Sequence, residues 1–126
     1  MTLPIETLLA QDQGTGEMPP DWAIEQAAAL WAAVVHLPGA TPHLGLDPVD
    51  GLPVINLFPN PRNKVGLQNL SVGCYPEGYD VCWVQRDAES NLVSFYESGL
   101  DVVVATNLIS GLFGVTKAGL SVEHQA

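Results

Sequence analysis

Two histidines and two carboxylates stand close together in the chain, and side chains of these types can hold a metal ion. His36 and His43 precede Asp47 and Asp50 in the pattern H-x6-H-x3-D-x2-D. Metal sites use spacings that bring their ligands to one helix face or one hairpin, and this spacing does neither. His36, near the end of an expected helix, is better explained by the helix dipole, which favours positive charge there. We therefore expect no metal ion and no cofactor.

The two cysteines, Cys74 and Cys82, could act as a nucleophile, as a redox pair or as small buried apolar groups. No histidine lies on the strands that carry them, so neither thiol has a base to activate it. Their spacing matches no zinc or redox motif, and two cysteines are too few for a disulfide scaffold. We expect reduced thiols. Whether the two pair across the intervening turn depends on the length of that turn, which the sequence leaves open.

Residues 111–117, GLFGVTK, place glycines before a lysine as phosphate-binding loops do. A P-loop requires the lysine directly after its second glycine, whereas two residues separate Gly114 from Lys117. The same segment, taken as the GXXG loop of a KH domain, lacks basic neighbours. Nucleotide and RNA binding are therefore not expected.

Carboxylates and aromatic side chains gather at the ends of the expected strands. A paired-carboxylate hydrolase needs two carboxylates at a defined separation in a cleft, and no such pair can be identified from the sequence. Aromatic anchors ringed by polar groups are typical of protein interfaces. We assign no catalytic residue, and we assign partner binding to Tyr75, Glu77, Tyr79, Asp80, Trp83, Asp87, Glu89 and Tyr96.

A sheet has to position these side chains. Short runs of alternating apolar residues, separated by turn residues, predict an antiparallel meander of four to five strands. Leu70, Val72 and Cys74 are expected on one face of their strand, opposite to Ser71, Gly73 and Tyr75. The strands are expected over residues 54–58, 67–75, 79–84, 92–97 and 101–105.

One main helix is expected over residues 21–37, because apolar residues recur there at helical spacing after two prolines that favour a helix start. It is apolar around most of its circumference, which is typical of a helix packed on a sheet. A short second helix is expected over residues 106–115. Residues 38–53 contain four prolines, which exclude a central strand, and we expect a long loop and a candidate binding surface there.

The bulk composition predicts one α+β domain over residues 1–126, with an N-terminal arm (1–18) and a C-terminal tail (119–126) loosely attached. The formal net charge of −10 disfavours nucleic acids and anionic membranes and favours a basic protein partner. The chain contains no long apolar run and no basic segment at its N-terminus, so we expect a cytoplasmic protein.

An acidic single domain without catalytic motifs suggests a protein that neutralises a protein partner by stoichiometric occlusion, as toxin-immunity proteins and phage-encoded defence inhibitors do. Two alternatives remain. One is a small enzyme or ligand-binding protein whose pocket lies between the helix, the 38–53 loop and the sheet, with His43, Asp47 and Cys74 as first candidates. The other is a phage or assembly subunit, including a homo-oligomer, joined through exposed strand edges.

Overall fold

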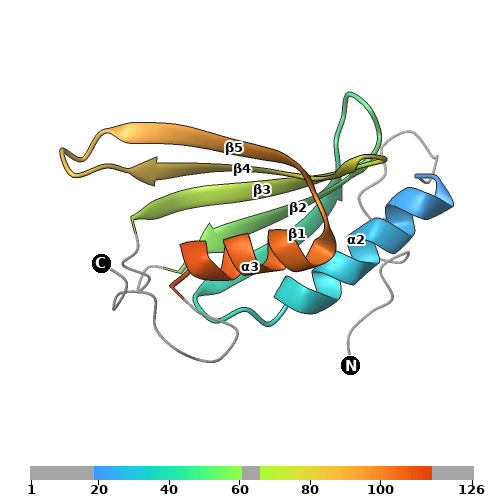
Figure 1. The fold of residues 1–126 in the computed structure, drawn as a ribbon, viewed down its shortest axis with the longest axis horizontal. Helices are drawn as coiled ribbons and strands as arrows, with labels where there is room; N and C mark the ends of the chain where they lie inside the picture. Colours follow the sequence, from blue (N-terminus) through green and yellow to red (C-terminus); the bar gives the residue numbers. More distant parts are fainter. Residues whose placement is uncertain (1–18, 61–65, 115–126) are drawn as a thin grey trace.

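The chain folds as an α+β domain in which one antiparallel sheet carries two helices (Figure 1). This computed structural model describes residues 19–60 and 66–114. The predicted arm (1–18) and tail (119–126) lie outside the described residues. The elements follow one another as α2 (Asp21–Val34), β1 (Ala40–Leu46), β2 (Pro53–Pro59), β3 (Leu67–Tyr75), β4 (Gly78–Arg86), β5 (Leu92–Leu100) and α3 (Val102–Leu112).

The five strands pair in the order in which they occur in the chain, β1-β2-β3-β4-β5, and all pairs are antiparallel. The expected meander is therefore confirmed. Pro76 and Glu77 alone connect β3 to β4, because Tyr75 pairs with Gly78. Gly78 has a φ of +135°, and a Cβ there would lie 2.7 Å from the carbonyl oxygen of Leu100. Only glycine therefore fits at the start of β4.

The expectation of a loop over residues 38–53 is wrong for its first half, which forms the edge strand β1. Of the four prolines, only Pro42 lies inside this strand. Proline is tolerated there because an edge strand need not donate a backbone hydrogen bond on its free side. The turn that follows β1 is closed by Asp47 and Asp50, whose side chains accept hydrogen bonds from the backbone N–H groups of Val49 (2.7 Å) and Leu52 (2.9 Å).

The expected strand over residues 101–105 is also wrong, because Val102 begins helix α3. Asp101 caps this helix: its carboxylate accepts a hydrogen bond of 2.8 Å from the N–H of Val104. A cap and a buried stripe at helical spacing outweigh the preference of β-branched residues for strands. The stripe consists of Ala105, Ile109 and Phe113. The second helix thus starts four residues earlier than predicted.

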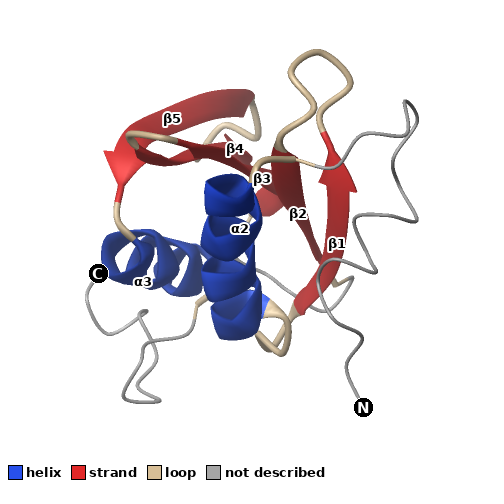
Figure 2. Ribbon diagram, turned by 90° about the vertical axis from the view of Figure 1, so that its right-hand side faces the viewer, coloured by secondary structure: helices blue, strands red, loops and turns tan. Residues whose placement is uncertain are grey.

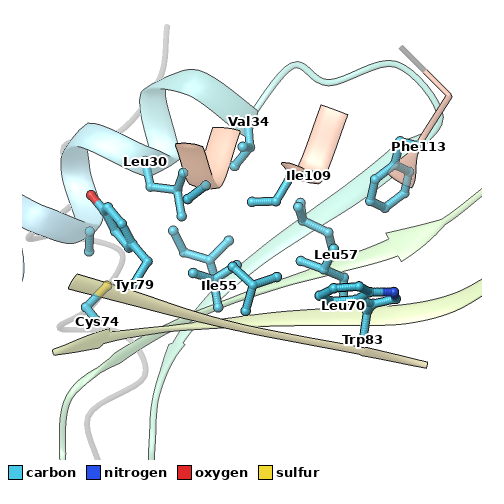
Figure 3. Close-up of a cluster of buried hydrophobic side chains, with 14 of the residues drawn as sticks. Leu30, Val34, Ile55, Leu57, Leu70, Cys74, Tyr79, Trp83, Ile109 and Phe113 are labelled. Atoms are coloured by element: carbon cyan, nitrogen blue, oxygen red, sulfur yellow. The ribbon is translucent and has the colours of Figure 1, made fainter. Parts of the chain in front are cut away.

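Both helices cover the same face of the sheet, which curls around them (Figure 2). They bury a core in which side chains of α2 and α3 meet inward-facing side chains of the strands (Figure 3). The fully buried face of α2 consists of Ala23, Ala27, Leu30 and Val34. This helix ends at Val34, three residues earlier than expected. No helix among residues 19–60 and 66–114 has the length and apolar character needed to cross a membrane.

Candidate functional site

The sheet has two faces with different chemistry, and the predicted binding residues divide between them. The inner face packs against the helices. The outer face, on the opposite side, is not covered by either helix (Figure 2). The side chains of β3 and β4 alternate between the two faces as predicted, with Cys74 on the inner face and Tyr75 on the outer face.

Tyr79 and Trp83 lie on the inner face, so they do not belong to an exposed binding surface. They are 3% and 8% exposed. The hydroxyl of Tyr79 donates a hydrogen bond to the carbonyl oxygen of Gln26 in α2, which ties the helix to β4. Burial raises the pKa of the Tyr79 phenol to about 12. The role of these two aromatic residues is to hold the core together.

Tyr75, Asp80 and Tyr96 come together on the outer face, from three consecutive strands. The hydroxyl of Tyr96 donates to Asp80 Oδ2 at 2.8 Å, and the backbone N–H of Gly99 donates to Asp80 Oδ1 at 3.3 Å. Both carboxylate oxygens are thus held by β5. The ring of Tyr75 folds back over Gly73, where a Cβ would lie 2.7 Å from its Cε2 atom. Gly73 pairs with Asp80, so this ring lies beside the carboxylate.

Two further carboxylates, Asp47 and Asp50 in the β1–β2 turn, act on Tyr75 through their negative charge. Burial, followed by the negative charges of Asp50, Asp47 and Asp80, raises the pKa of the Tyr75 phenol. The hydrogen bond to Asp80 raises the pKa of Tyr96. Both phenols therefore stay protonated at neutral pH, as hydrogen-bond donors among carboxylates. We call these five residues, Tyr75, Tyr96, Asp47, Asp50 and Asp80, the acidic tyrosine cluster.

The other three predicted binding residues lie at turns. Glu77 is exposed in the β3–β4 turn, at the same end of the sheet as the acidic tyrosine cluster. Asp87 and Glu89 lie in the β4–β5 turn at the opposite end, where Asp87 Oδ1 accepts from the N–H groups of Glu89 and Asn91, both at 2.9 Å. The predicted carboxylates therefore form two separate groups rather than one rim.

The outer face also contains a shallow depression of about 260 Å³ between β3, β4 and β5, with Ser71, Cys82 and Tyr96 among its lining residues. Cys82 is exposed there, whereas Cys74 is fully buried in the core, and both thiols are free. A two-residue turn pairs Cys74 with Tyr79 and Cys82 with Ser71, so the two thiols lie on opposite faces and cannot form a disulfide. Burial raises the pKa of Cys74 to about 12 and also raises that of Cys82.

The enzyme pocket considered in the sequence analysis would lie between α2, β1 and the sheet. The space between α2, β1 and the sheet is filled by core side chains, including Leu30, Leu44 and Ile55. His43 is exposed on the outer face, and Cys74 is buried on the inner face. Among residues 19–60 and 66–114, no three His, Cys, Asp or Glu side chains lie close enough together to hold a metal ion.

Sequence reasoning did not assign Asp47 and Asp50 to the binding group. It treated both as metal-ligand candidates in a loop that was a candidate binding surface, and Asp47 also as a candidate for an enzyme pocket. One signal was available: Pro76-Glu77 followed by Gly78 suggests a two-residue turn. Such a turn would have set Tyr75 and Asp80 on the same face of the sheet.

The geometry of this chain is the basis for any functional assignment, since comparisons with protein-family models, with curated proteins and with solved structures return no match.

Proposed function

We propose that the protein binds a basic segment of a protein partner through the acidic tyrosine cluster and neutralises that partner by stoichiometric occlusion. The observation that carries this proposal is the fixed carboxylate of Asp80. Both of its oxygens are held by β5, and the aromatic rings of Tyr75 and Tyr96 lie beside it. A carboxylate oriented in advance loses little entropy when it binds a cation.

A lysine or arginine side chain matches this arrangement. Its charge would pair with Asp80, and its stem or guanidinium plane would lie against a tyrosine ring, as cations do over aromatic faces. Among residues 19–60 and 66–114 the only lysine or arginine is Arg86, whose Nη1 donates to the carbonyl oxygen of Ser90 (2.7 Å) in the β4–β5 turn. No lysine or arginine of the described chain therefore competes for the cluster.

The overall charge favours the same class of partner. A net charge of −10 attracts a basic protein and accelerates association at low salt. We also propose that binding takes place in the cytoplasm, where an exposed thiol such as Cys82 stays reduced.

Protein capture from a lysate of the native host, at low and at moderate salt, tests the proposal. The immobilised baits are the wild type, the double variant Glu77→Lys/Asp80→Lys, and the double variant Asp87→Lys/Glu89→Lys as a control. The two variants change the net charge equally, but at opposite ends of the sheet. At low salt, we expect the wild type and the control to retain one dominant basic protein in a one-to-one complex. Glu77→Lys/Asp80→Lys should not retain this protein. At moderate salt, the wild type and the control should lose it as well.

Two results would overturn the proposal. Equal retention of that protein by both double variants would remove the acidic tyrosine cluster from binding. Recovery of the bait alone, by the wild type at low salt, would exclude a basic protein partner.

A further inference from the structure

The shallow depression on the outer face adjoins the acidic tyrosine cluster. Its lining side chains belong to two neighbouring rows that run across β3, β4 and β5. They are Ser71, Cys82 and Tyr96 in one row, and Asn69, Val84 and Ser94 in the other. The serine and cysteine side chains are small, so they leave a hollow of about 260 Å³ between the larger side chains of Tyr96 and Val84.

Tyr96 connects the depression to Asp80. Its side chain lines the depression, and its hydroxyl donates the 2.8 Å hydrogen bond to Asp80 Oδ2. Asp80 and Cys82 are two residues apart in β4, so their side chains project from the same face, about 7 Å apart along the strand. A ligand bound at Asp80 therefore has the depression directly beside it.

The depression differs from the acidic tyrosine cluster in its charge. Burial and the charge of Asp80 raise the pKa of Cys82, so all six lining side chains are uncharged at neutral pH. A charged side chain would find no counter-charge here, whereas an apolar one can cover the Cys82 sulfur and the ring of Tyr96. The hydroxyl of Ser71 already donates to Asn56 Oδ1 (2.5 Å), so covering it leaves no unpaired donor. The depression therefore suits an apolar side chain.

We propose that the depression receives a large apolar side chain of the same basic segment that binds the acidic tyrosine cluster. This inference rests on the proposed function and adds a sequence requirement to the partner. Alternate side chains of an extended segment point the same way and lie about 7 Å apart, which matches the separation of Asp80 and Cys82 along β4. The recognised segment is therefore extended and carries a lysine or arginine and a large apolar residue two positions apart.

Titration of the full chain with three short peptides, followed by NMR of the backbone amides, tests the proposal. The peptides have blocked ends and flanking glycines, and they contain Arg-Gly-Phe, Arg-Gly-Ser or Arg-Phe-Gly. We expect the first to bind about tenfold more tightly than the second, because only the first can bury a large apolar side chain. The third has the composition of the first but the wrong spacing, so it should bind no better than the second.

Filling the depression should remove the advantage of the phenylalanine peptide. Ser94→Phe places a ring in the depression from an exposed position of β5, so the affinity of the Arg-Gly-Phe peptide should fall to that of the Arg-Gly-Ser peptide. Ala88→Phe is the matched control, because Ala88 is exposed in the β4–β5 turn and does not line the depression. This control should preserve the difference between the two peptides.

Alkylation of Cys82 is a second measurement, which needs no variant and so stays decisive if Ser94→Phe unfolds the chain. Cys82 is exposed and Cys74 is buried, so iodoacetamide should label Cys82 alone in the folded protein. The Arg-Gly-Phe peptide should slow this reaction, because its apolar side chain covers the Cys82 sulfur. The Arg-Gly-Ser peptide at equal occupancy should not.

Three results would overturn this inference: equal affinity of the Arg-Gly-Phe and Arg-Gly-Ser peptides, equal affinity of the Arg-Gly-Phe and Arg-Phe-Gly peptides, or unchanged alkylation of Cys82 at saturation with the Arg-Gly-Phe peptide. Each of these leaves the basic-partner proposal standing. That proposal fails separately if Asp80→Asn does not weaken binding of the Arg-Gly-Ser peptide. If no peptide binds up to millimolar concentration, both are overturned.

Discussion

The indole of Trp83 stacks on the ring of Phe95 across the β4–β5 pair, with centroids 5.4 Å apart and planes inclined by 14°. Trp83 lies within the core, whereas Phe95 lies on the edge strand. The stack therefore connects the interior of the domain to the edge strand β5.

Substitution should show that the two residues of this stack contribute unequally to the stability of the fold. Trp83→Ala should destabilise the domain by about 3 to 5 kcal/mol, because it removes a large buried side chain and leaves a cavity. Phe95→Leu should cost about 0.5 to 1.5 kcal/mol, because an apolar group stays in place and only the aromatic contact is lost. Urea unfolding of a dilute, monomeric sample measures both. Equal losses would contradict the burial difference described above.

Alkaline pH should weaken the fold through two inner-face residues. Burial raises the pKa of Cys74 from 9.0, and that of Tyr79 from 10.0, to about 12 in the folded protein. The folded state therefore binds these protons more tightly than the unfolded chain, so their contribution to stability is complete below about pH 9 and is lost as the pH rises to about 12. The free energy of unfolding should fall across this window, and less steeply in Cys74→Ala/Tyr79→Phe. An unchanged slope in the double variant would assign the loss to other groups.

The contribution of the Asp101 cap of α3 to the stability of the fold should be measurable separately. Asp101→Ala removes the carboxylate that accepts the N–H of Val104 and should cost about 0.5 to 2 kcal/mol. Asp101→Asn, the matched control, keeps a side-chain oxygen in place and should cost much less. Thermal unfolding of both variants distinguishes loss of the hydrogen bond from loss of the charge, since the asparagine variant would be equally destabilised if charge alone mattered.

The two thiols should differ in reactivity. A thiol reagent such as DTNB should label one cysteine in the folded protein and two after denaturation, because Cys82 is exposed and Cys74 is fully buried. Cys82→Ser should abolish labelling of the folded protein, whereas Cys74→Ser should not. Rapid labelling of both thiols without denaturant would contradict the position of Cys74 in the core.

The strands that alternate cleanly could be predicted from the sequence. The bounds of β3 were predicted correctly, and the faces of β3 and β4 follow from a side-chain period of two. The strand β1 could not be recognised, because proline content indicates where a central strand cannot lie but not where an edge strand can. Helix α3 was partly missed because three valines favour a strand locally, while its buried contacts with α2 and β4 exist only in the folded domain.

The candidate site was less accessible to sequence reasoning. Tyr75, Asp80 and Tyr96 meet only because of the strand register, and Asp47 joins them from a turn that is distant in the chain. Composition suggested an interface of carboxylates and aromatic residues. It could not distinguish Tyr79, which faces the helices, from Tyr75, which does not.

The order of elements also sets an order of assembly during synthesis. Each strand pairs with the strand made just before it, so the sheet can grow one hairpin at a time. Helix α3 leaves the ribosome after the whole sheet, yet Ala105, Ile109 and Phe113 are part of its core. Until α3 docks, apolar residues of α2 and the sheet face water. A chain whose α3 has not yet docked therefore exposes apolar surface that chaperones can bind, and docking of α3 covers that surface.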